Sequence, residues 1–203
     1  MTTPLITELT PEQIRAAVVD RYGQVASNPT GTFNFPVGRA FAEAIGYPPA
    51  TLDRLPDEAS RSFAGVTYYH GRTNLQPGET VLDLGTGAGM DILIAAHAVG
   101  ETGKVIAIDY SKEMVALARA NAKRAGVTGV EIHQAPIERL PVTDATIDIA
   151  QANGVFNLSA AKEQAVSEVY RTLKPGGRLI AAEIALTRDV PAAERATMQD
   201  WFR

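Results

Sequence analysis

The sequence predicts an α/β domain built on a parallel sheet, and three observations support this class. An apolar run at 81–84 passes into a turn rich in glycine, and four further runs of strand-like composition follow it. Segments with helical periodicity separate most of these runs from one another. Such alternation is typical of parallel strands joined by right-handed crossovers. A chain of 203 residues is long enough to bury one full core.

Residues 1–75 are expected to form a helical cap that belongs to the same structural unit as the sheet. Thr10 suits an N-cap, and Gln13 stands three residues later, which predicts a helix that starts with a capping box. Two shorter helices are expected, one over about 37–45 and one after Pro56. Aromatic residues are frequent in this part, so we expect it to cover the ligand site.

Residues 76–203 are expected to hold the sheet, with the spatial strand order 3-2-1-4-5. Helices are expected after Ser111 and Ser159, and Pro175 is expected to end the second of them. That second helix carries Val166, Val169, Tyr170 and Leu173 at the spacing of a face packed on the sheet. The predicted strands cover residues 81–84, 105–108, 129–134, 147–152 and 178–184.

The last stretch, 187–203, predicts a helix with Met198, Trp201 and Phe202 on one face. Residues for sixth and seventh strands are apparently absent, which leaves the edge of the fifth strand exposed. An exposed edge favours association. We therefore expect a possible homodimer, formed through this edge or through the C-terminal helix.

The glycine-rich turn after the first strand indicates a nucleotide-type ligand. Gly85, Gly87 and Gly89 alternate along it, two residues after Asp83, and such a loop lets a ligand approach the main chain. A dinucleotide fingerprint of the form GxGxxG would need glycine at position 90, where the chain has Met90. The pattern GxGxG therefore disfavours a protein linked to NAD or to a nucleotide sugar, as does the LysProGlyGly segment that follows the fourth strand.

A second carboxylate stands where a ribose would be held. Asp109 ends the second apolar run, twenty residues after Gly89. An acidic side chain at the tip of the second strand of such a sheet accepts hydrogen bonds from ribose hydroxyls. The order of glycine turn and acid along the chain therefore supports an adenosine-containing ligand.

These motifs resemble those of the class I S-adenosylmethionine-dependent methyltransferases, and within them the arsenite methyltransferase-like group. The resemblance implies a Rossmann-like sheet, S-adenosylmethionine as cofactor and S-adenosylhomocysteine as its product. The segments that carry it are 46–47, 55–56, 63–65, 78–91, 137–141 and 153–159. The cofactor-binding residues that it implies are Asp83, Gly85, Thr86, Gly87, Gly89, Asp91, Asp109, Tyr110, Met114, Ile137, Glu138 and Asn153.

The chain departs from that group at the arsenic ligands, because it contains no cysteine. The group's cysteines follow the PheAlaGly segment and begin the loop after the fourth strand, where this chain has Val66, Thr67 and Gly154. Trivalent arsenic is soft and prefers thiolates. We therefore expect methyl transfer to a small apolar or neutral molecule rather than to arsenite.

The residues that act on the acceptor are less defined by the sequence. His70 is a candidate general base because histidine titrates near neutrality, and Tyr69 is a second catalytic candidate. The three histidines lie far apart in the sequence, so no metal site is expected. Candidates for acceptor contacts are Tyr22, Tyr68, Gly154 and Phe156.

Composition restricts the partners and offers one further alternative. The net charge is −4 without a cluster of lysine and arginine, which argues against nucleic acid. No apolar run approaches 18 residues and no secretory signal is apparent, so we expect no membrane partner and a cytoplasmic location. A non-catalytic S-adenosylmethionine-binding regulator remains the alternative, and turnover of labelled cofactor distinguishes it from an enzyme.

Overall fold

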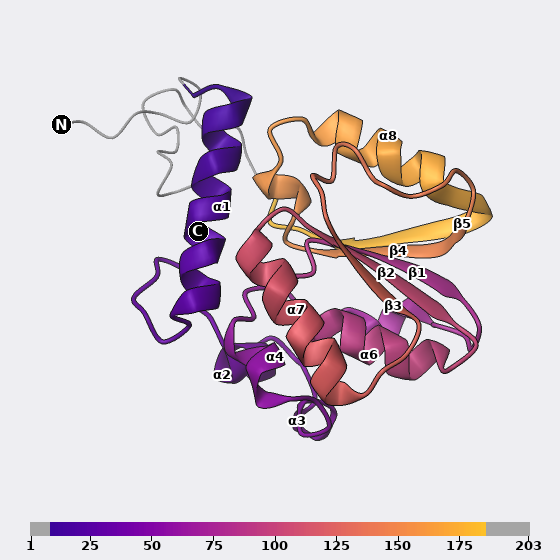
Figure 1. Ribbon diagram of the computed structural model, residues 1–203, viewed down its shortest axis with the longest axis horizontal. Helices are drawn as coiled ribbons and strands as arrows, with labels where there is room; N and C mark the ends of the chain where they lie inside the picture. The colour runs from indigo at the N-terminus through magenta and orange to yellow at the C-terminus, as the bar shows by residue number, and fades with distance from the viewer. Residues whose placement is uncertain (1–8, 186–203) are drawn as a thin grey trace.

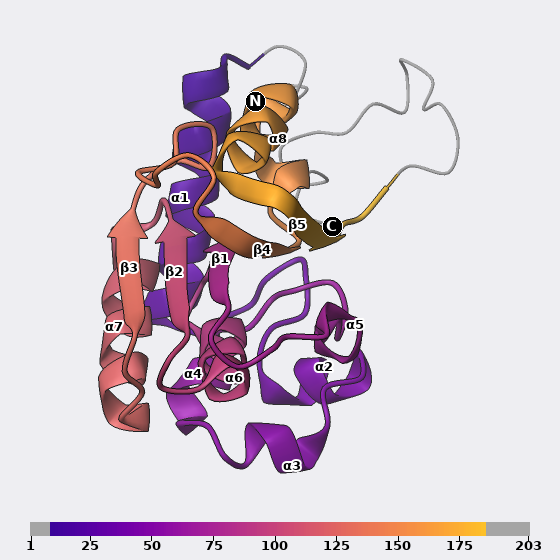
Figure 2. The ribbon, with the colours of Figure 1, turned by 90° about the vertical axis from the view of Figure 1, so that its right-hand side faces the viewer.

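The computed structural model describes residues 9–185, which form one five-stranded parallel sheet with helices on both faces (Figure 1). The strand order is β3-β2-β1-β4-β5, which confirms the predicted topology. In Figure 2 the arrowheads of β2 and β3 point the same way, as parallel pairing requires. The strands are β1 (Thr80–Leu84), β2 (Lys104–Asp109), β3 (Val130–Gln134), β4 (Ile147–Asn153) and β5 (Leu173–Ala182).

Alternate residues of the strands face two separate cores. Val81 and Val105 point to the face covered by α6 (Met90–Val99) and α7 (Lys112–Ala125). Leu82 and Ile106 point to the opposite face, where α8 (Lys162–Thr172) packs. This follows from the two-residue period of a strand, which sends neighbouring side chains to opposite faces. Nearly all of these side chains are apolar because both faces of the sheet are covered.

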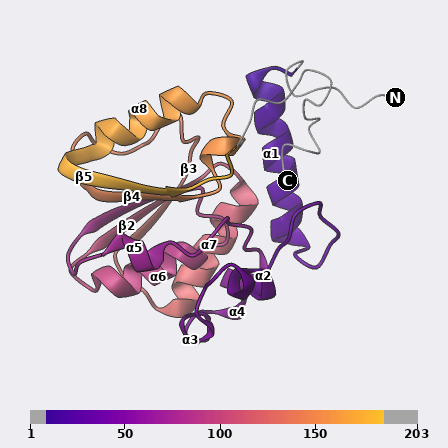
Figure 3. The same ribbon diagram turned by 180° about the vertical axis from the view of Figure 1, so that it is seen from behind.

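The N-terminal part of the chain divides into two groups of helices. The helix α1 (Pro11–Ser27) begins with the predicted capping box of Thr10 and stands apart from the others, at one end of the sheet (Figure 3). The remaining helices lie beside α6 and α7. They are α2 (Arg39–Ala44), α3 (Pro49–Leu52), α4 (Asp57–Arg61) and α5 (His70–Thr73), of which α3 and α5 were not predicted. Side chains of α2, α3 and α4 join the same core as those of α6 and α7.

The helix α8 ends at Thr172, three residues before Pro175, but β5 begins earlier than the predicted strand over 178–184. Leu173 already pairs with Ile147 as the first residue of β5, so the LysProGlyGly segment lies within the strand. The register then shifts before Arg178 pairs with Ile149. A proline and two glycines fit such an irregular stretch, because they tolerate a bulge and the loss of a ladder hydrogen bond.

The predicted buried face of α8 was wrong in part. Val169 is buried as expected, whereas Val166 and Tyr170 are 49% and 80% exposed and Ala165 joins the core instead. Because α8 lies over the edge of the sheet, only a narrow stripe of it meets apolar neighbours.

The C-terminal helix predicted around Met198, Trp201 and Phe202 lies outside the described residues. Within residues 9–185, no helix has the length and apolar character needed to cross a bilayer.

Candidate functional site

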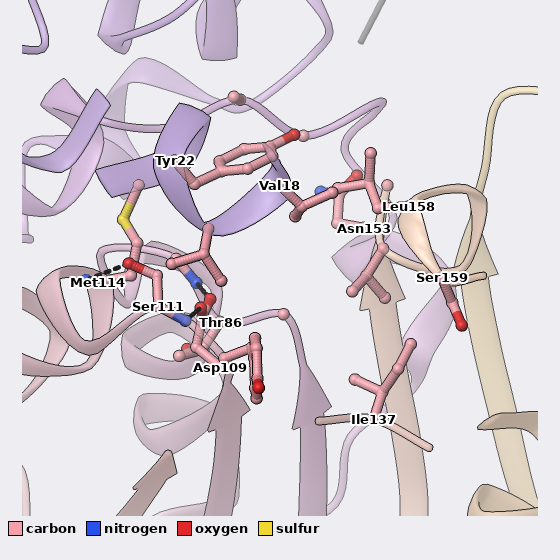
Figure 4. Close-up of a pocket in the computed structure, with 18 of the residues that line it drawn as sticks. Val18, Tyr22, Thr86, Asp109, Ser111, Met114, Ile137, Asn153, Leu158 and Ser159 are labelled. Atoms are coloured by element: carbon pink, nitrogen blue, oxygen red, sulfur yellow. Dashed lines mark hydrogen bonds between the residues drawn. The ribbon is translucent and has the colours of Figure 1, made fainter. Parts of the chain in front are cut away.

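A cavity lies at the carboxyl ends of β1, β2 and β4, beneath α1. Figure 4 shows Val18 and Tyr22 reaching into it from α1, on the side opposite Thr86 and Asp109. Parallel α/β sheets bind ligands at this edge, because the loops that follow the strands open there. The cavity therefore lies where the sequence placed the ligand.

The glycine turn after β1 forms the floor of the cavity. At Gly85, with φ +67°, a Cβ would stand 2.6 Å from Cγ2 of Val155, so no larger residue fits. At Gly87, with φ +54°, a Cβ would meet no atom within 4 Å. Gly87 lines the cavity, and its missing side chain leaves the space in which a ligand can lie against the main chain.

Asp109 ends β2 at the middle of this floor. Its carboxylate accepts hydrogen bonds from the backbone N–H groups of Gly87 and Ser111, at 2.9 and 2.8 Å. Burial raises the pKa of Asp109 to about 6, although hydrogen bonds from backbone N–H groups oppose the shift. The carboxylate is thus held in place by two loops and remains largely ionised at neutral pH, ready to accept further donors.

A second group of residues surrounds one end of the cavity, on the side of β2 and of the segment after β3. Glu138 lines this end and accepts a hydrogen bond from Ser159 Oγ at 2.5 Å. Tyr110, Met114 and Ile137 add apolar surface nearby. Such a combination of apolar walls and one polar group suits a flat heterocycle such as adenine.

Asp91 also lines the cavity but differs from the other carboxylates. Its oxygens accept hydrogen bonds from Tyr47 Oη at 2.7 Å and from His70 Nε2 at 2.9 Å, and further ones from Tyr69 and Asn153. Burial raises the pKa of Asp91, but the charge of His70 and these hydrogen bonds outweigh it and hold the pKa below its ordinary value. The group is therefore a buried, fully hydrogen-bonded anion.

The two candidate catalytic residues lie behind Asp91 rather than in the cavity. Among the described residues, the cavity lining includes neither His70 nor Tyr69. Both side chains are buried, and burial together with Asp91 raises the pKa of Tyr69 far above its usual value. Their geometry suits support of Asp91 rather than proton transfer with a bound acceptor.

Asp83 is buried in the sheet below the cavity lining. It pairs laterally with Gln151 of β4, whose amide donates a hydrogen bond to Asp83 Oδ1 at 2.8 Å. Burial, and to a smaller degree the charge of Asp91, raises the pKa of Asp83 to about 8. Gly89 also lies off the lining, because it turns the chain into α6 against Ala118.

Of the four residues predicted to contact the acceptor, two line the cavity and two lie elsewhere. Tyr22 and Gly154 line the cavity. Burial and the negative charges of Asp109 and Glu183 raise the pKa of Tyr22, so its hydroxyl stays protonated. Tyr68 instead packs edge-on against Tyr47, and Phe156 lies in the core beneath α8.

Apart from Tyr22 and Gly154, sequence reasoning missed the side of the lining that α1 and two loops supply. Arg15, Val18 and Val19 share one face of α1 with Tyr22, and their helical spacing is the signal that was present in the sequence. The rest of this side comes from the segment before β1 and from the loop after β4. These additional lining residues are Phe63, Ala64, Gly65, Val155, Leu158, Ser159 and Ala160.

A family model described as a methyltransferase domain matches residues 75–203, which is more than half of the chain. The chain belongs to the class I S-adenosylmethionine-dependent methyltransferases. The glycine floor, Asp109 and the Ile137–Glu138 segment all lie within the matched part. S-adenosylmethionine is the methyl donor of this family.

Individual relatives agree with the family. An arsenite methyltransferase of Halobacterium salinarum is 31% identical over 201 residues, covering 92% of this chain and 51% of the relative. A ubiquinone/menaquinone biosynthesis C-methyltransferase of Escherichia fergusonii is 41% identical over 115 residues, covering 56% of this chain and 45% of the relative.

A solved structure shows the same fold. An arsenic(III) S-adenosylmethionine methyltransferase from Chlamydomonas reinhardtii superposes with a TM-score of 0.58 at 28% identity, covering 76% of this chain and 51% of that one. The chain spans about half the length of the curated relatives named here.

The cavity fits the family cofactor. The open space at Gly87 admits the ligand to the main chain, and Asp109 faces it as an acceptor for a ribose diol. Thr86 also lines the cavity, between the two glycines of its floor. Across residues 9–185, no cluster of His, Asp or Glu is arranged to hold a metal ion.

Proposed function

We propose that this chain transfers a methyl group from S-adenosylmethionine to a small, neutral or apolar acceptor that is not arsenite. The observation that carries the proposal is the mixed lining of the cavity. The glycine loop and Asp109 on its floor, with Glu138, supply polar groups that suit the cofactor. The remaining wall, here called the acceptor half, includes Val18, Phe63 and Leu158, whose apolar side chains suit an uncharged acceptor.

The site offers no thiolate to arsenic. Val66 and Gly154 occupy the regions in which the arsenite methyltransferase-like group has cysteines, and they are close together: a Cβ on Gly154 would stand 3.1 Å from Val66 Cγ2. The residues that replace the cysteines thus form one patch at the edge of the acceptor half. An apolar side chain and a glycine present no soft ligand there.

The carboxylates of the lining are already engaged, which restricts the reaction. Asp91, Asp109 and Glu138 each accept hydrogen bonds from the protein, and Tyr22 holds its proton. The bound cofactor supplies an electrophilic methyl group on a sulfonium. The protein then has to hold the acceptor in line with it and exclude water. We therefore propose an acceptor whose nucleophilic atom needs no side-chain base.

Calorimetry with S-adenosylmethionine, S-adenosylhomocysteine and NAD tests the cofactor half of the proposal. We expect binding of the first two and none of the third. Transfer of labelled methyl groups to a panel of neutral aromatic, thiol and amine acceptors tests the acceptor half. Binding of NAD without binding of S-adenosylmethionine would refute the assignment, and cofactor binding without transfer to any acceptor would favour the regulatory alternative.

A further inference from the structure

Asp91 lies at the start of α6 and accepts hydrogen bonds from four side chains. Oδ1 accepts from Tyr47 Oη at 2.7 Å and from His70 Nε2 at 2.9 Å. Oδ2 accepts from Asn153 Nδ2 at 3.2 Å and from Tyr69 Oη at 3.3 Å. A carboxylate offers about four acceptor sites, so these donors leave none for a ligand.

The donors come from parts of the chain that are far apart in sequence. Tyr47 follows α2, Tyr69 and His70 stand at the start of α5, and Asn153 ends β4. Asp91 itself follows the glycine floor directly. One buried anion therefore joins the N-terminal helices, the central sheet and the helix that begins at the cofactor loop.

Asn153 extends this network to residues 63–67, here called the connector. Its Oδ1 accepts from the Val66 N–H at 2.6 Å, and its Nδ2 donates to the Thr67 carbonyl at 3.1 Å and to Tyr47 Oη at 3.0 Å. A Cβ on Gly65 would stand 2.6 Å from Asn153 Nδ2, so the main chain approaches the amide as closely as glycine permits. The connector is thereby fixed against the end of β4.

The connector forms part of the acceptor wall. Phe63, Ala64 and Gly65 line the cavity, and Val66 stands next to Gly154. Any shift of the connector would move this wall relative to the glycine floor. Displacements of about 1 Å at an acceptor site are enough to cost about 100-fold in rate.

We propose that Asp91 is a positioning residue, which sets the connector against the cofactor loop through Tyr47 and Asn153, rather than a ligand of the cofactor. This role rests on the proposed function, because it assigns the acceptor wall to the connector. Tyr69 and His70 complete the set of donors, so both act on the site through Asp91. Asn153 is likewise a positioning residue, because its hydrogen bonds hold the connector in place.

Two variants of the 203-residue chain test the proposal. Tyr47→Phe removes one donor and leaves the Asp91 carboxylate in place, and Asp91→Asn removes the charge while keeping the shape. The readouts are hydrogen exchange at the Val66 and Thr67 amides without ligand, and calorimetric affinity for S-adenosylhomocysteine. We expect exchange at both amides to rise at least tenfold in each variant, while Tyr47→Phe binds S-adenosylhomocysteine within threefold of wild type.

Tyr68→Phe is the matched control, because Tyr68 packs on the Tyr47 ring at 5.0 Å between centroids and does not contact Asp91 through any hydrogen bond found within residues 9–185. It should leave exchange at Val66 unchanged. The Leu82 amide in the centre of the sheet reports global opening and should stay protected in all three variants. A merely structural role would raise exchange at Leu82 and Val66 together.

Two results would overturn the proposal. One is exchange at Val66 within threefold of wild type in both variants. The other is a loss of S-adenosylhomocysteine affinity of tenfold or more in Asp91→Asn with exchange at Val66 unchanged, which would make Asp91 a cofactor ligand. Wild-type binding of S-adenosylhomocysteine tests the proposed function separately, because the exchange comparison needs no ligand.

Discussion

The carboxylate of Asp109 accepts a hydrogen bond from the backbone N–H of Gly87, across 2.9 Å between the end of β2 and the glycine loop after β1. This bond fixes the two segments of the proposed cofactor site to each other. The proposed acceptor side is held by a different carboxylate, Asp91, and a different set of donors. Because separate networks hold the two halves, substitutions can be designed to affect one half at a time.

Asp109→Ala should weaken binding of S-adenosylmethionine by about 10- to 150-fold. A hydrogen bond to a charged group is worth about 1.5–3 kcal/mol, and each 1.4 kcal/mol is tenfold in affinity. Calorimetry with the variant checks this. Asp53→Ala, which removes an exposed carboxylate paired with Arg39, is the control and should bind as wild type does. Unchanged affinity in a folded Asp109→Ala protein would show that the ribose lies elsewhere.

Cofactor affinity should fall in acid. The pKa of Asp109 is raised to about 6 in the free protein, and hydrogen bonds from a ribose diol are stronger to the ionised carboxylate than to the neutral acid. Below that pH the stronger acceptor forms only after the carboxyl loses a proton, so affinity should fall by up to about tenfold per pH unit below about 6. Calorimetry between pH 5 and 7.5 measures this. Asp109→Asn should bind weakly at every pH, and a wild-type affinity that stays constant over the range contradicts the prediction.

Gly87→Ala should separate folding from binding. A Cβ there meets no protein atom within 4 Å but would occupy the open space above the floor. The left-handed backbone, with φ +54°, should cost about 1–2 kcal/mol of stability, whereas S-adenosylhomocysteine affinity should fall tenfold or more. Gly126→Ala has the same kind of backbone, with φ +67°, and equally free surroundings at the end of α7. It should show the stability loss alone, so equal affinity in both variants argues against a ligand at Gly87.

Asp83 should make the protein less stable as pH rises. Its folded pKa of about 8 lies above its ordinary value, so the folded state binds the proton more tightly than the unfolded state. The stabilisation is complete below the unfolded pKa of about 4 and is lost as pH rises through about 8. Asp83→Asn removes this titration. Urea unfolding gives the free energy of unfolding of both proteins at pH 5.5 and 8.5. Between these pH values the wild type should lose stability relative to Asp83→Asn by up to about 1.4 kcal/mol per pH unit. A constant difference would mean that Asp83 does not titrate in this window.

Arsenite should not be methylated, because the described acceptor patch of Val66 and Gly154 offers no thiolate and the whole chain lacks cysteine. An assay with S-adenosylmethionine and arsenite, with analysis of methylated arsenic, checks this. Glutathione in the assay can supply thiolates of its own. Varying its concentration and replacing it with another thiol identifies that route, and methylation that is independent of the thiol refutes the prediction.

The sequence by itself determined the fold class, the strand order and the place of the glycine turn and Asp109 on the floor of the cavity. Short apolar runs and the positions of Gly85, Gly87 and Asp109 carry that information, because they act through the local backbone and through the ends of single strands. The start of α1 could also be predicted, because the capping box at Thr10 depends only on residues close to it in the sequence. Local patterns also misled in part: Val169 of the predicted face of α8 is buried, but the spacing that added Val166 and Tyr170 did not show how far the sheet extends beneath that helix.

The tertiary structure alone decided which polar side chains face the cavity. His70 was a candidate base by its chemistry, yet it lies behind Asp91, and Asn153 holds the connector. These contacts join residues separated by 21 and 87 positions. No local pattern encodes such pairs, because a side chain's partner depends on how α2, α5 and β4 pack around α6. Periodicity and motifs describe the chain along its length, whereas a buried hydrogen-bond network exists only once distant segments meet.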